Sequence, residues 1–196
     1  MSPLCSPLSN EDRRALLELA RRAILEAVRS GHVLDFPPPT GALKERSGAF
    51  VTLHLRGRLR GCIGQVEPAC PLAETVVRCA RGAALEDPRF SPVIADEVGN
   101  LNIEVSILSA LHPASPEDVE IGRHGLVVMQ GGRRGLLLPQ VALERAWLRE
   151  RFLEETCLKT GLEPNAWKDP ETRLWVFTTE IFSEADYFSP RPAPVD

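Results

Sequence analysis

The chain has 196 residues, of which 43% are hydrophobic and 26% charged, a size and composition that suit one globular domain with room for a smaller lobe. Acidic residues outnumber basic ones by 27 to 23, for a formal charge of −4, which excludes a basic field over the whole molecule but not a local basic patch. The five cysteines include no C-x-x-C pair, so we expect neither a disulfide framework nor a metal site.

Targeting signals are missing from the sequence pattern. The N-terminal residues show no basic region followed by an apolar run, so we expect no signal peptide. No apolar stretch approaches the roughly 20 residues that a membrane helix needs. With reduced cysteines, these patterns predict a cytoplasmic protein.

The first quarter of the chain predicts a helix followed by a hairpin. Residues 11–30 repeat apolar side chains at intervals of three and four, which is typical of an amphipathic helix, and Gly31 is its natural stop. Residues 49–55 alternate as a strand, 56–58 supply a turn, and a return strand begins at Leu59.

The return strand carries a hexapeptide, Leu59-Arg60-Gly61-Cys62-Ile63-Gly64. Strand alternation places Arg60 and Cys62 on one face, where a guanidinium near the sulfur would favour the thiolate. Gly61 and Gly64 would let a ligand or another backbone approach closely. The alternative is a small buried cysteine with glycines at a β-bulge.

A second helix is expected to begin at Pro71, with Cys79 on its core-facing side. The stiff loop that follows, 87–92, carries Asp87 and Arg89 between prolines. Its charges either enter a pocket or form an ordinary surface pair of little energetic value.

Residues 101–108 alternate strictly between apolar and polar side chains. If this strand neighbours the hairpin, Glu104 shares a face with Cys62; the alternative is a solvated sheet face. His124, between two glycines, is either a plain loop histidine or a group that exchanges protons near neutral pH.

The last third predicts strands at 126–129 and 136–139, a helix over 142–160 with Cys157 in the core, and a central strand over 174–182. A mobile tail is expected over 186–196. No G-x-G-x-x-G or G-K-[ST] motif occurs, so we expect no nucleotide cofactor bound through them, and no other cofactor is indicated.

The hexapeptide resembles the signature of the AMMECR family, also called protein A of the AmmeMemoRadiSam system. Further matches follow in the family's order over residues 10–185, expected to form a single domain: Asp87 to Pro92, Ile103 to Leu108, Gly122 to Leu126 and Leu137 to Val141. Ser91 is a small departure, since the family often has proline there.

The resemblance implies an α+β fold, with mainly antiparallel β-sheet flanked by helices and a smaller lobe. It also implies a Memo-like protein and a radical SAM protein as partners. Carried onto this chain, the signature makes Arg60 and Cys62 the central pair of a site. Asp87, Arg89, Glu104 and His124 are further residues for the same site.

Three functions remain open from the sequence. In the first, Cys62 is a reactive thiolate of an enzyme component, Arg60 stabilises it, and His124 or Glu104 transfers the proton. In the second, the hexapeptide shapes a non-catalytic docking surface, with Gly61, Gly64, Asp87 and Arg89, for those partners or for a small anion. In the third, arginines of the hairpin bind nucleic acid, which the net charge disfavours.

Overall fold

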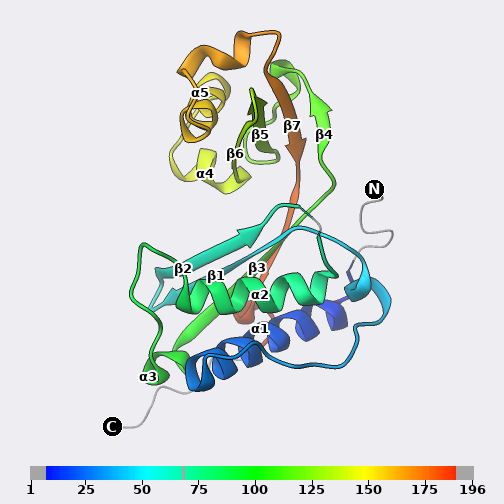
Figure 1. Ribbon diagram of the computed structural model, residues 1–196, viewed down its shortest axis with the longest axis vertical. Helices are drawn as coiled ribbons and strands as arrows, with labels where there is room; N and C mark the ends of the chain where they lie inside the picture. The colour runs from blue at the N-terminus through cyan, green and yellow to red at the C-terminus, as the bar shows by residue number, and fades with distance from the viewer. Residues whose placement is uncertain (1–7, 68, 189–196) are drawn as a thin grey trace. The chain divides into compact units, whose positions relative to one another are not determined.

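The computed structural model describes residues 8–67 and 69–188, and these residues form two compact units (Figure 1). We call residues 108–179 the inserted unit. The interrupted unit comprises the described residues before 108 and residues 180–188. Each unit has its own antiparallel four-stranded sheet, so the α+β fold predicted from the resemblance is confirmed.

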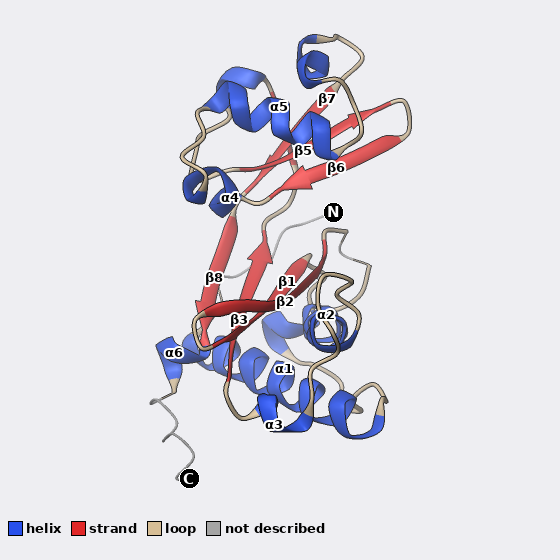
Figure 2. Cartoon of the chain, turned by 90° about the vertical axis from the view of Figure 1, so that its left-hand side faces the viewer, coloured by secondary structure: helices blue, strands red, loops and turns tan. Residues whose placement is uncertain are grey.

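The interrupted unit is built on a sheet with strand order β2-β1-β3-β8. Its strands are β1 (Ala49–Leu55), β2 (Arg58–Gln65), β3 (Leu101–Leu108) and β8 (Thr179–Ser183). Its helices are α1 (Asn10–Ser30), α2 (Leu72–Leu85), α3 (Ala95–Val98) and α6 (Glu184–Tyr187), with a short 3-10 turn at Gly41–Lys44. Figure 2 shows α1 and α2 gathered on one side of this sheet.

Helix α1 matches its prediction because its end signals are strong. The Ser9 hydroxyl accepts a hydrogen bond from the Asp12 amide, and the Asp12 carboxylate accepts one from the Ser9 amide, which forms a capping box. At the other end, Gly31 adopts a left-handed conformation with φ of 76°. Its buried stripe includes Leu16 and Ile24.

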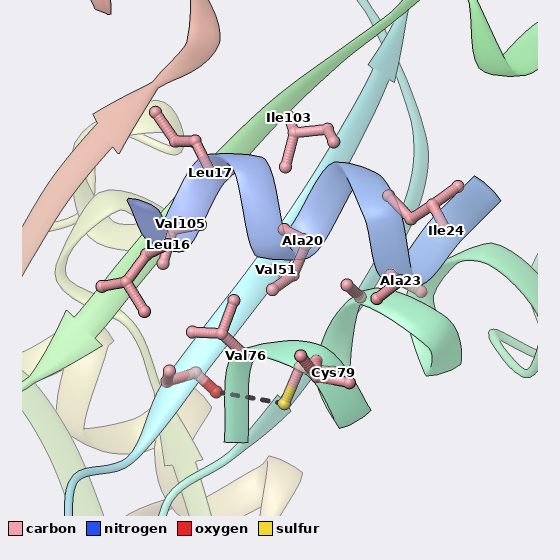
Figure 3. Close-up of a cluster of buried hydrophobic side chains, with 14 of the residues drawn as sticks. Leu16, Leu17, Ala20, Ala23, Ile24, Val51, Val76, Cys79, Ile103 and Val105 are labelled. Atoms are coloured by element: carbon pink, nitrogen blue, oxygen red, sulfur yellow. Dashed lines mark hydrogen bonds between the residues drawn. The ribbon is translucent and has the colours of Figure 1, made fainter. Parts of the chain in front are cut away.

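The core of the interrupted unit lies between this stripe, α2 and the sheet (Figure 3). Leu16, Val51 and Ile103 have no solvent exposure, and each buried side chain of this size stabilises the fold by about 1.5–3 kcal/mol. Cys79 belongs to this core, as predicted, and its thiol donates to the Ala49 carbonyl. Burial raises the pKa of Cys79 to about 12, so this thiol stays protonated at neutral pH.

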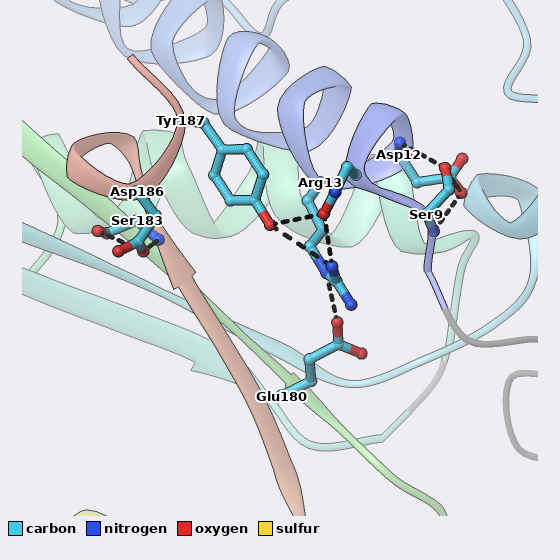
Figure 4. A network of polar contacts seen from close by, with 8 residues as sticks. Ser9, Asp12, Arg13, Glu180, Ser183, Asp186 and Tyr187 are labelled. Atoms are coloured by element: carbon cyan, nitrogen blue, oxygen red, sulfur yellow. Dashed lines mark hydrogen bonds and ion pairs between the residues drawn. The ribbon is translucent and has the colours of Figure 1, made fainter. Parts of the chain in front are cut away.

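Two arginines of α1, Arg13 and Arg21, bind acidic residues from the C-terminal part of the interrupted unit, and Figure 4 shows the contacts of Arg13. Arg13 pairs with Glu180 at the surface, with an N–O distance of 2.6 Å. Deeper in, Arg21 pairs with Glu184 through two hydrogen bonds, and both side chains are almost fully buried. Removing one partner of such a pair leaves a buried charge without compensation. These contacts attach β8 and α6 to the first helix of the unit.

The inserted unit has the strand order β4-β7-β5-β6. Its strands are β4 (His112–Ala114), β5 (Gly125–Gln130), β6 (Arg133–Leu137) and β7 (Arg173–Phe177), and its helices are α4 (Pro139–Glu144) and α5 (Arg149–Lys159). Short 3-10 turns occupy Pro116–Asp118 and Pro164–Lys168. A separate apolar core includes Phe152, Leu126 and Cys157, the last as predicted.

Two elements predicted as continuous are divided in the structure. The expected helix over 142–160 breaks between α4 and α5, where Ala146 has a positive φ of 50° and Leu148 is 80% exposed instead of inward. The expected strand over 174–182 breaks at Thr178, so that β7 is central in one sheet and β8 is an edge of the other. Apolar periodicity runs across both breaks, which is why the pattern does not reveal them.

The end of the described chain is helical, since α6 covers Glu184–Tyr187. The rest of the predicted tail, 189–196, lies outside the described residues. Among the helices that the structure describes, none combines the length and apolar character needed to cross a bilayer.

Candidate functional site

The sheet of the interrupted unit carries a row of paired polar residues on the face that α1 and α2 do not cover. Cys62 on β2 lies opposite Thr52 on β1, and Thr52 lies opposite Glu104 on β3. Directly opposed residues of antiparallel strands point to the same face. The prediction that Glu104 shares a face with Cys62 is therefore confirmed, while its role in chemistry stays a prediction.

Cys62 is held through its main chain at the outer edge of β2. Its amide donates to a carboxylate oxygen of Asp87 at 2.8 Å, and its carbonyl accepts from the Arg89 guanidinium at 3.4 Å. Both main-chain groups thus point away from β1. Cys62 and Thr52 therefore form the type of pair whose side chains lie closer together.

Two polar groups interact with the Cys62 side chain, namely the Thr52 hydroxyl and the Arg89 guanidinium, whose pKa is raised chiefly by Asp87 and also by Cys62. The Thr52 hydroxyl donates to Sγ at an O–S distance of 3.3 Å. The Cys62 side chain is half-buried, so the thiol is fixed in place without being sealed in the core. A donor aimed at sulfur stabilises the thiolate more than the thiol.

Asp87 is buried, and both of its carboxylate oxygens accept hydrogen bonds. It accepts from the Arg89 amide, from the Arg89 guanidinium at 2.9 and 2.7 Å, and from the Cys62 amide. The Arg89 guanidinium, together with the two amides, holds the pKa of Asp87 well below its usual range. The Asp87–Arg89 pair therefore occupies main-chain groups of an edge strand that would otherwise be open to solvent.

Arg60 lies at an irregularity in the hairpin. The register shifts between Leu53 and His54, which pair with Gly61 and Leu59, so Arg60 is the unpaired residue of a β-bulge. The strict alternation from which we placed Arg60 beside Cys62 is broken at this point.

The Arg60 guanidinium is engaged by the segment that follows the Asp87 loop. It donates to both carboxylate oxygens of Glu97, at 2.9 and 2.8 Å, and to the carbonyls of Ser91 and Pro92. Hydrogen bonding within this pair raises the pKa of Arg60 and lowers the pKa of Glu97. Arg60 thus binds residues 91–97 to β2, and its guanidinium is directed at this segment rather than at the Cys62 sulfur.

The two glycines of the hexapeptide accommodate the protein itself. A Cβ at Gly61 would lie 2.1 Å from the carbonyl oxygen of Ala83, so its absence lets the backbone of α2 approach β2. A Cβ at Gly64 would overlap the ring of Phe50, the residue opposite it on β1. Gly61 therefore lets another backbone approach closely, which is one of the two uses expected from the sequence, and Gly64 makes room for an aromatic ring of β1.

His124 belongs to the inserted unit, whereas the other predicted site residues belong to the interrupted unit. Its Nδ1 lies 3.1 Å from the Asp118 carbonyl and 3.2 Å from the Glu120 amide nitrogen. The ring thus bridges the ends of its own loop. Its predicted part in proton transfer remains a prediction.

Four cysteines lie in the described part of the chain, and they are free thiols. Cys79 and Cys157 are buried, while Cys62 and Cys70 are half-buried. Cys5 lies outside the described residues. No group of three histidine, cysteine or acidic side chains positioned to hold a metal ion occurs within residues 8–67 and 69–188.

Sequence reasoning missed Thr52 and Glu97. Thr52 sits on the polar side of a strictly alternating strand, but naming it as the partner of Cys62 requires the hairpin register. Glu97 lies in α3, a helix of four residues with no periodicity to detect. Nothing in the sequence indicates that Glu97 pairs with Arg60.

Comparisons with known proteins agree on one family. The AMMECR1 family model matches residues 17–182. A protein of Methanothermobacter thermautotrophicus is 44% identical over 187 residues, covering 91% of this chain and 97% of the relative. A protein of Thermococcus gammatolerans is 45% identical, covering 86% and 88%. The crystal structure of the uncharacterized protein PH0010 from Pyrococcus horikoshii is similar with a TM-score of 0.82 and 41% identity, covering 90% and 93% of the two chains.

Proposed function

This chain belongs to the AMMECR1 family, and from its site we propose that it is an enzyme component in which the Cys62 thiolate acts as the nucleophile. The observation that carries the proposal is the hydrogen bond from the Thr52 hydroxyl to the half-buried sulfur. A nucleophilic cysteine needs a stabilised thiolate and a fixed direction of attack. In this proposal Thr52 stabilises the thiolate, and the two main-chain contacts of Cys62 fix the direction of attack.

The proposal assigns different roles to the residues of the site. Cys62 adds to a carbonyl carbon of a small substrate: the carbon–sulfur bond forms while the carbon–oxygen π bond breaks and its electron pair moves to the oxygen. Glu104, in the same row beyond Thr52, accepts the thiol proton. Arg60 and Asp87 are positioning residues, because they fix the loop and the strand around Cys62 and do not contact its sulfur.

Thiol alkylation tests this proposal with a control inside the chain. Cys70 is also half-buried and lies 3.3 Å from the Thr75 hydroxyl, but that hydroxyl donates to the carbonyls of Ser47 and Pro71, so Cys70 is a reference thiol whose neighbouring hydroxyl is engaged elsewhere. In a Cys5→Ser background, mass spectrometry should show that iodoacetamide modifies Cys62 at least about tenfold faster than Cys70 at pH 7.

The Thr52→Val variant sharpens the alkylation test. Valine preserves the shape of threonine but removes the donor to sulfur, so the alkylation of Cys62 should slow severalfold while that of Cys70 stays unchanged. Equal rates for the two thiols in the parent protein, together with no effect of Thr52→Val, would rule out an activated Cys62.

A second function, docking of a Memo-like and a radical SAM partner, is favoured by the loop that Arg60 fastens. Arg89 and Ile94 are 56% and 60% exposed although the loop is tied firmly to β2. Rigid loops with exposed arginine and apolar side chains suit protein recognition.

Binding of the purified partners separates the two functions. Ile94→Ser should abolish partner binding and leave Cys62 alkylation intact if docking is the function. If catalysis is the function, Cys62→Ser should abolish turnover and leave partner binding intact. Undiminished partner binding by Ile94→Ser and Arg89→Gln would count against docking at this loop.

A further inference from the structure

The turn between β1 and β2 has an unusual residue at a strained position. Arg56 and Gly57 form a two-residue loop, and both have positive φ, 51° and 75°. Such loops favour asparagine, aspartate or glycine at the first position, because a longer side chain is strained there. Arginine at this position calls for an explanation beyond turn formation.

A hollow of about 570 Å³ lies beside this turn. Its lining consists of Leu55, Arg56, Arg58, Leu59 and Arg60, with no acidic side chain. It therefore combines three guanidinium groups with two leucines, and Leu59 is 42% exposed. This composition is basic on a chain whose formal charge is −4.

Two of the three guanidinium groups are available for a ligand. Arg60 is committed to Glu97. Arg56 and Arg58, in contrast, have neither an ion pair nor a side-chain hydrogen bond within the part of the chain that the structure describes. The strained turn thus presents two unneutralised charges at the end of the hairpin.

We infer that the β1–β2 turn is a docking site for an acidic segment of a protein partner that also presents an apolar side chain. Arg56 and Arg58 bind its carboxylates through their planar forks, and the apolar side chain packs on Leu59. The positive charge that attracts an acidic partner is confined to this turn, since the chain as a whole has a formal charge of −4.

The lining favours this occupant over a nucleic acid. Single-stranded nucleic acid is bound by a basic groove with aromatic side chains that stack on the bases, and no aromatic residue lines this hollow. The overall negative charge also opposes a long polyphosphate. Exposed leucine beside arginine is instead the composition of a protein-recognition surface.

The experiment measures binding of a defined probe to the full chain. The probe is a fluorescent, end-blocked peptide in which pairs of glutamates alternate with single leucines. Its binding is measured by fluorescence anisotropy. The double variant Arg56→Gln/Arg58→Gln should weaken binding by about fivefold for each arginine removed. Raising the salt concentration from about 50 to about 500 mM should weaken binding to the parent protein as well.

A matched charge control is available on α1. Arg22 and Arg29 are exposed and have no partner among the described residues. The variant Arg22→Gln/Arg29→Gln therefore removes the same charge elsewhere and should leave the affinity unchanged. Loss of affinity equal to that of the turn variant would overturn the proposal, because it would show that only net charge matters. Absence of any binding by the parent protein would overturn it too.

The identity of the ligand is tested with two further probes. A peptide with serine in place of leucine should bind the parent protein more weakly, and Leu59→Ser should affect only the leucine-containing peptide. The second probe is an oligothymidine of matched charge. If it binds as tightly as the peptide and loses affinity in the same variants, the turn recognises phosphate instead.

Arg56→Asn separates docking from folding. Asparagine tolerates a positive φ better than arginine, so this variant should melt a few degrees higher than the parent protein. It should nevertheless bind the acidic peptide about fivefold more weakly. Unchanged binding by this more stable variant would contradict a role for the Arg56 guanidinium.

Discussion

Replacing Asp87 by alanine removes the carboxylate that links the 87–97 loop to the edge of β2. In the parent protein this group is 5% exposed and accepts from the Cys62 amide and from Arg89. The variant leaves the Cys62 amide and the Arg89 guanidinium without their acceptor. We therefore expect a less stable interrupted unit with a loosened edge at Cys62.

The size of the effect follows from these contacts. A hydrogen bond to a charged acceptor contributes about 1.5–3 kcal/mol, and the Cys62 amide donates one. The ion pair with Arg89 adds only about 0.5 kcal/mol, because the arginine is 56% exposed and solvent screens it. The free energy of unfolding should fall by about 2–4 kcal/mol at pH 7.

The stability that Asp87→Ala loses should depend on pH in a defined direction. The pKa of Asp87 is depressed in the folded protein, so its contribution is complete above the unfolded value of about 3.9 and is lost as the pH falls through the folded value. The difference in stability between the parent protein and Asp87→Ala should therefore be constant from about pH 8 to about pH 5 and shrink below about pH 4.

Urea unfolding followed by far-UV circular dichroism gives the free energy, and amide hydrogen exchange at Cys62 reports on the edge itself. Asp96→Ala is the control, because Asp96 is an exposed aspartate of the neighbouring helix α3 and should change stability by less than about 0.5 kcal/mol. A loss of less than about 1 kcal/mol for Asp87→Ala, with unchanged exchange at Cys62, would refute the view that Asp87 holds this edge.

Three further predictions concern packing, ion pairing and reactivity. Gly61→Ala should destabilise the protein by about 1–3 kcal/mol in urea unfolding, because its Cβ would enter the backbone of α2, whereas Gly99→Ala has open space and should be near neutral. Glu184→Ala should cost about 3–5 kcal/mol by leaving the Arg21 charge buried and unpaired; a cost under about 1 kcal/mol would show that water reaches this site. Cys79, with its pKa raised to about 12, should resist iodoacetamide at pH 8 in the native protein and become reactive only after unfolding; rapid labelling of the native protein would contradict its burial.

The sequence predicts those elements whose signals are local. Helix α1 has a stop at Gly31 and a clear apolar stripe, and the structure reproduces both. Cys79 was assigned to the core from helical spacing and is 3% exposed. Thr52 and Glu104 share a face by alternation once β3 is placed beside β1, whereas Cys62 joins that face only through the register shift in the hairpin.

The hairpin bulge shows why the geometry of the site is beyond sequence reasoning. A regular two-residue turn with Leu55 opposite Arg58 would pair Cys62 with Val51, on the face that packs against the helices. The extra residue, Arg60, shifts the register by one, so Cys62 instead lies opposite Thr52 on the other face. The glycines of the hexapeptide allow a β-bulge, which is the alternative interpretation of the sequence, but they do not say which residue is extra, because the tertiary contacts of Arg60 and Gly61 set its position.

The division of the interrupted unit along the chain has a consequence for biosynthesis. Residues 108–179 are contiguous, so the inserted unit is able to acquire its fold while the ribosome is still translating. The sheet that carries Cys62 lacks β8 until residues 179–183 emerge, and Arg21 lacks its partner until Glu184 follows. A ribosome that stops shortly after residue 179 would release a chain with one finished unit and one open sheet edge, and such edges attract other chains.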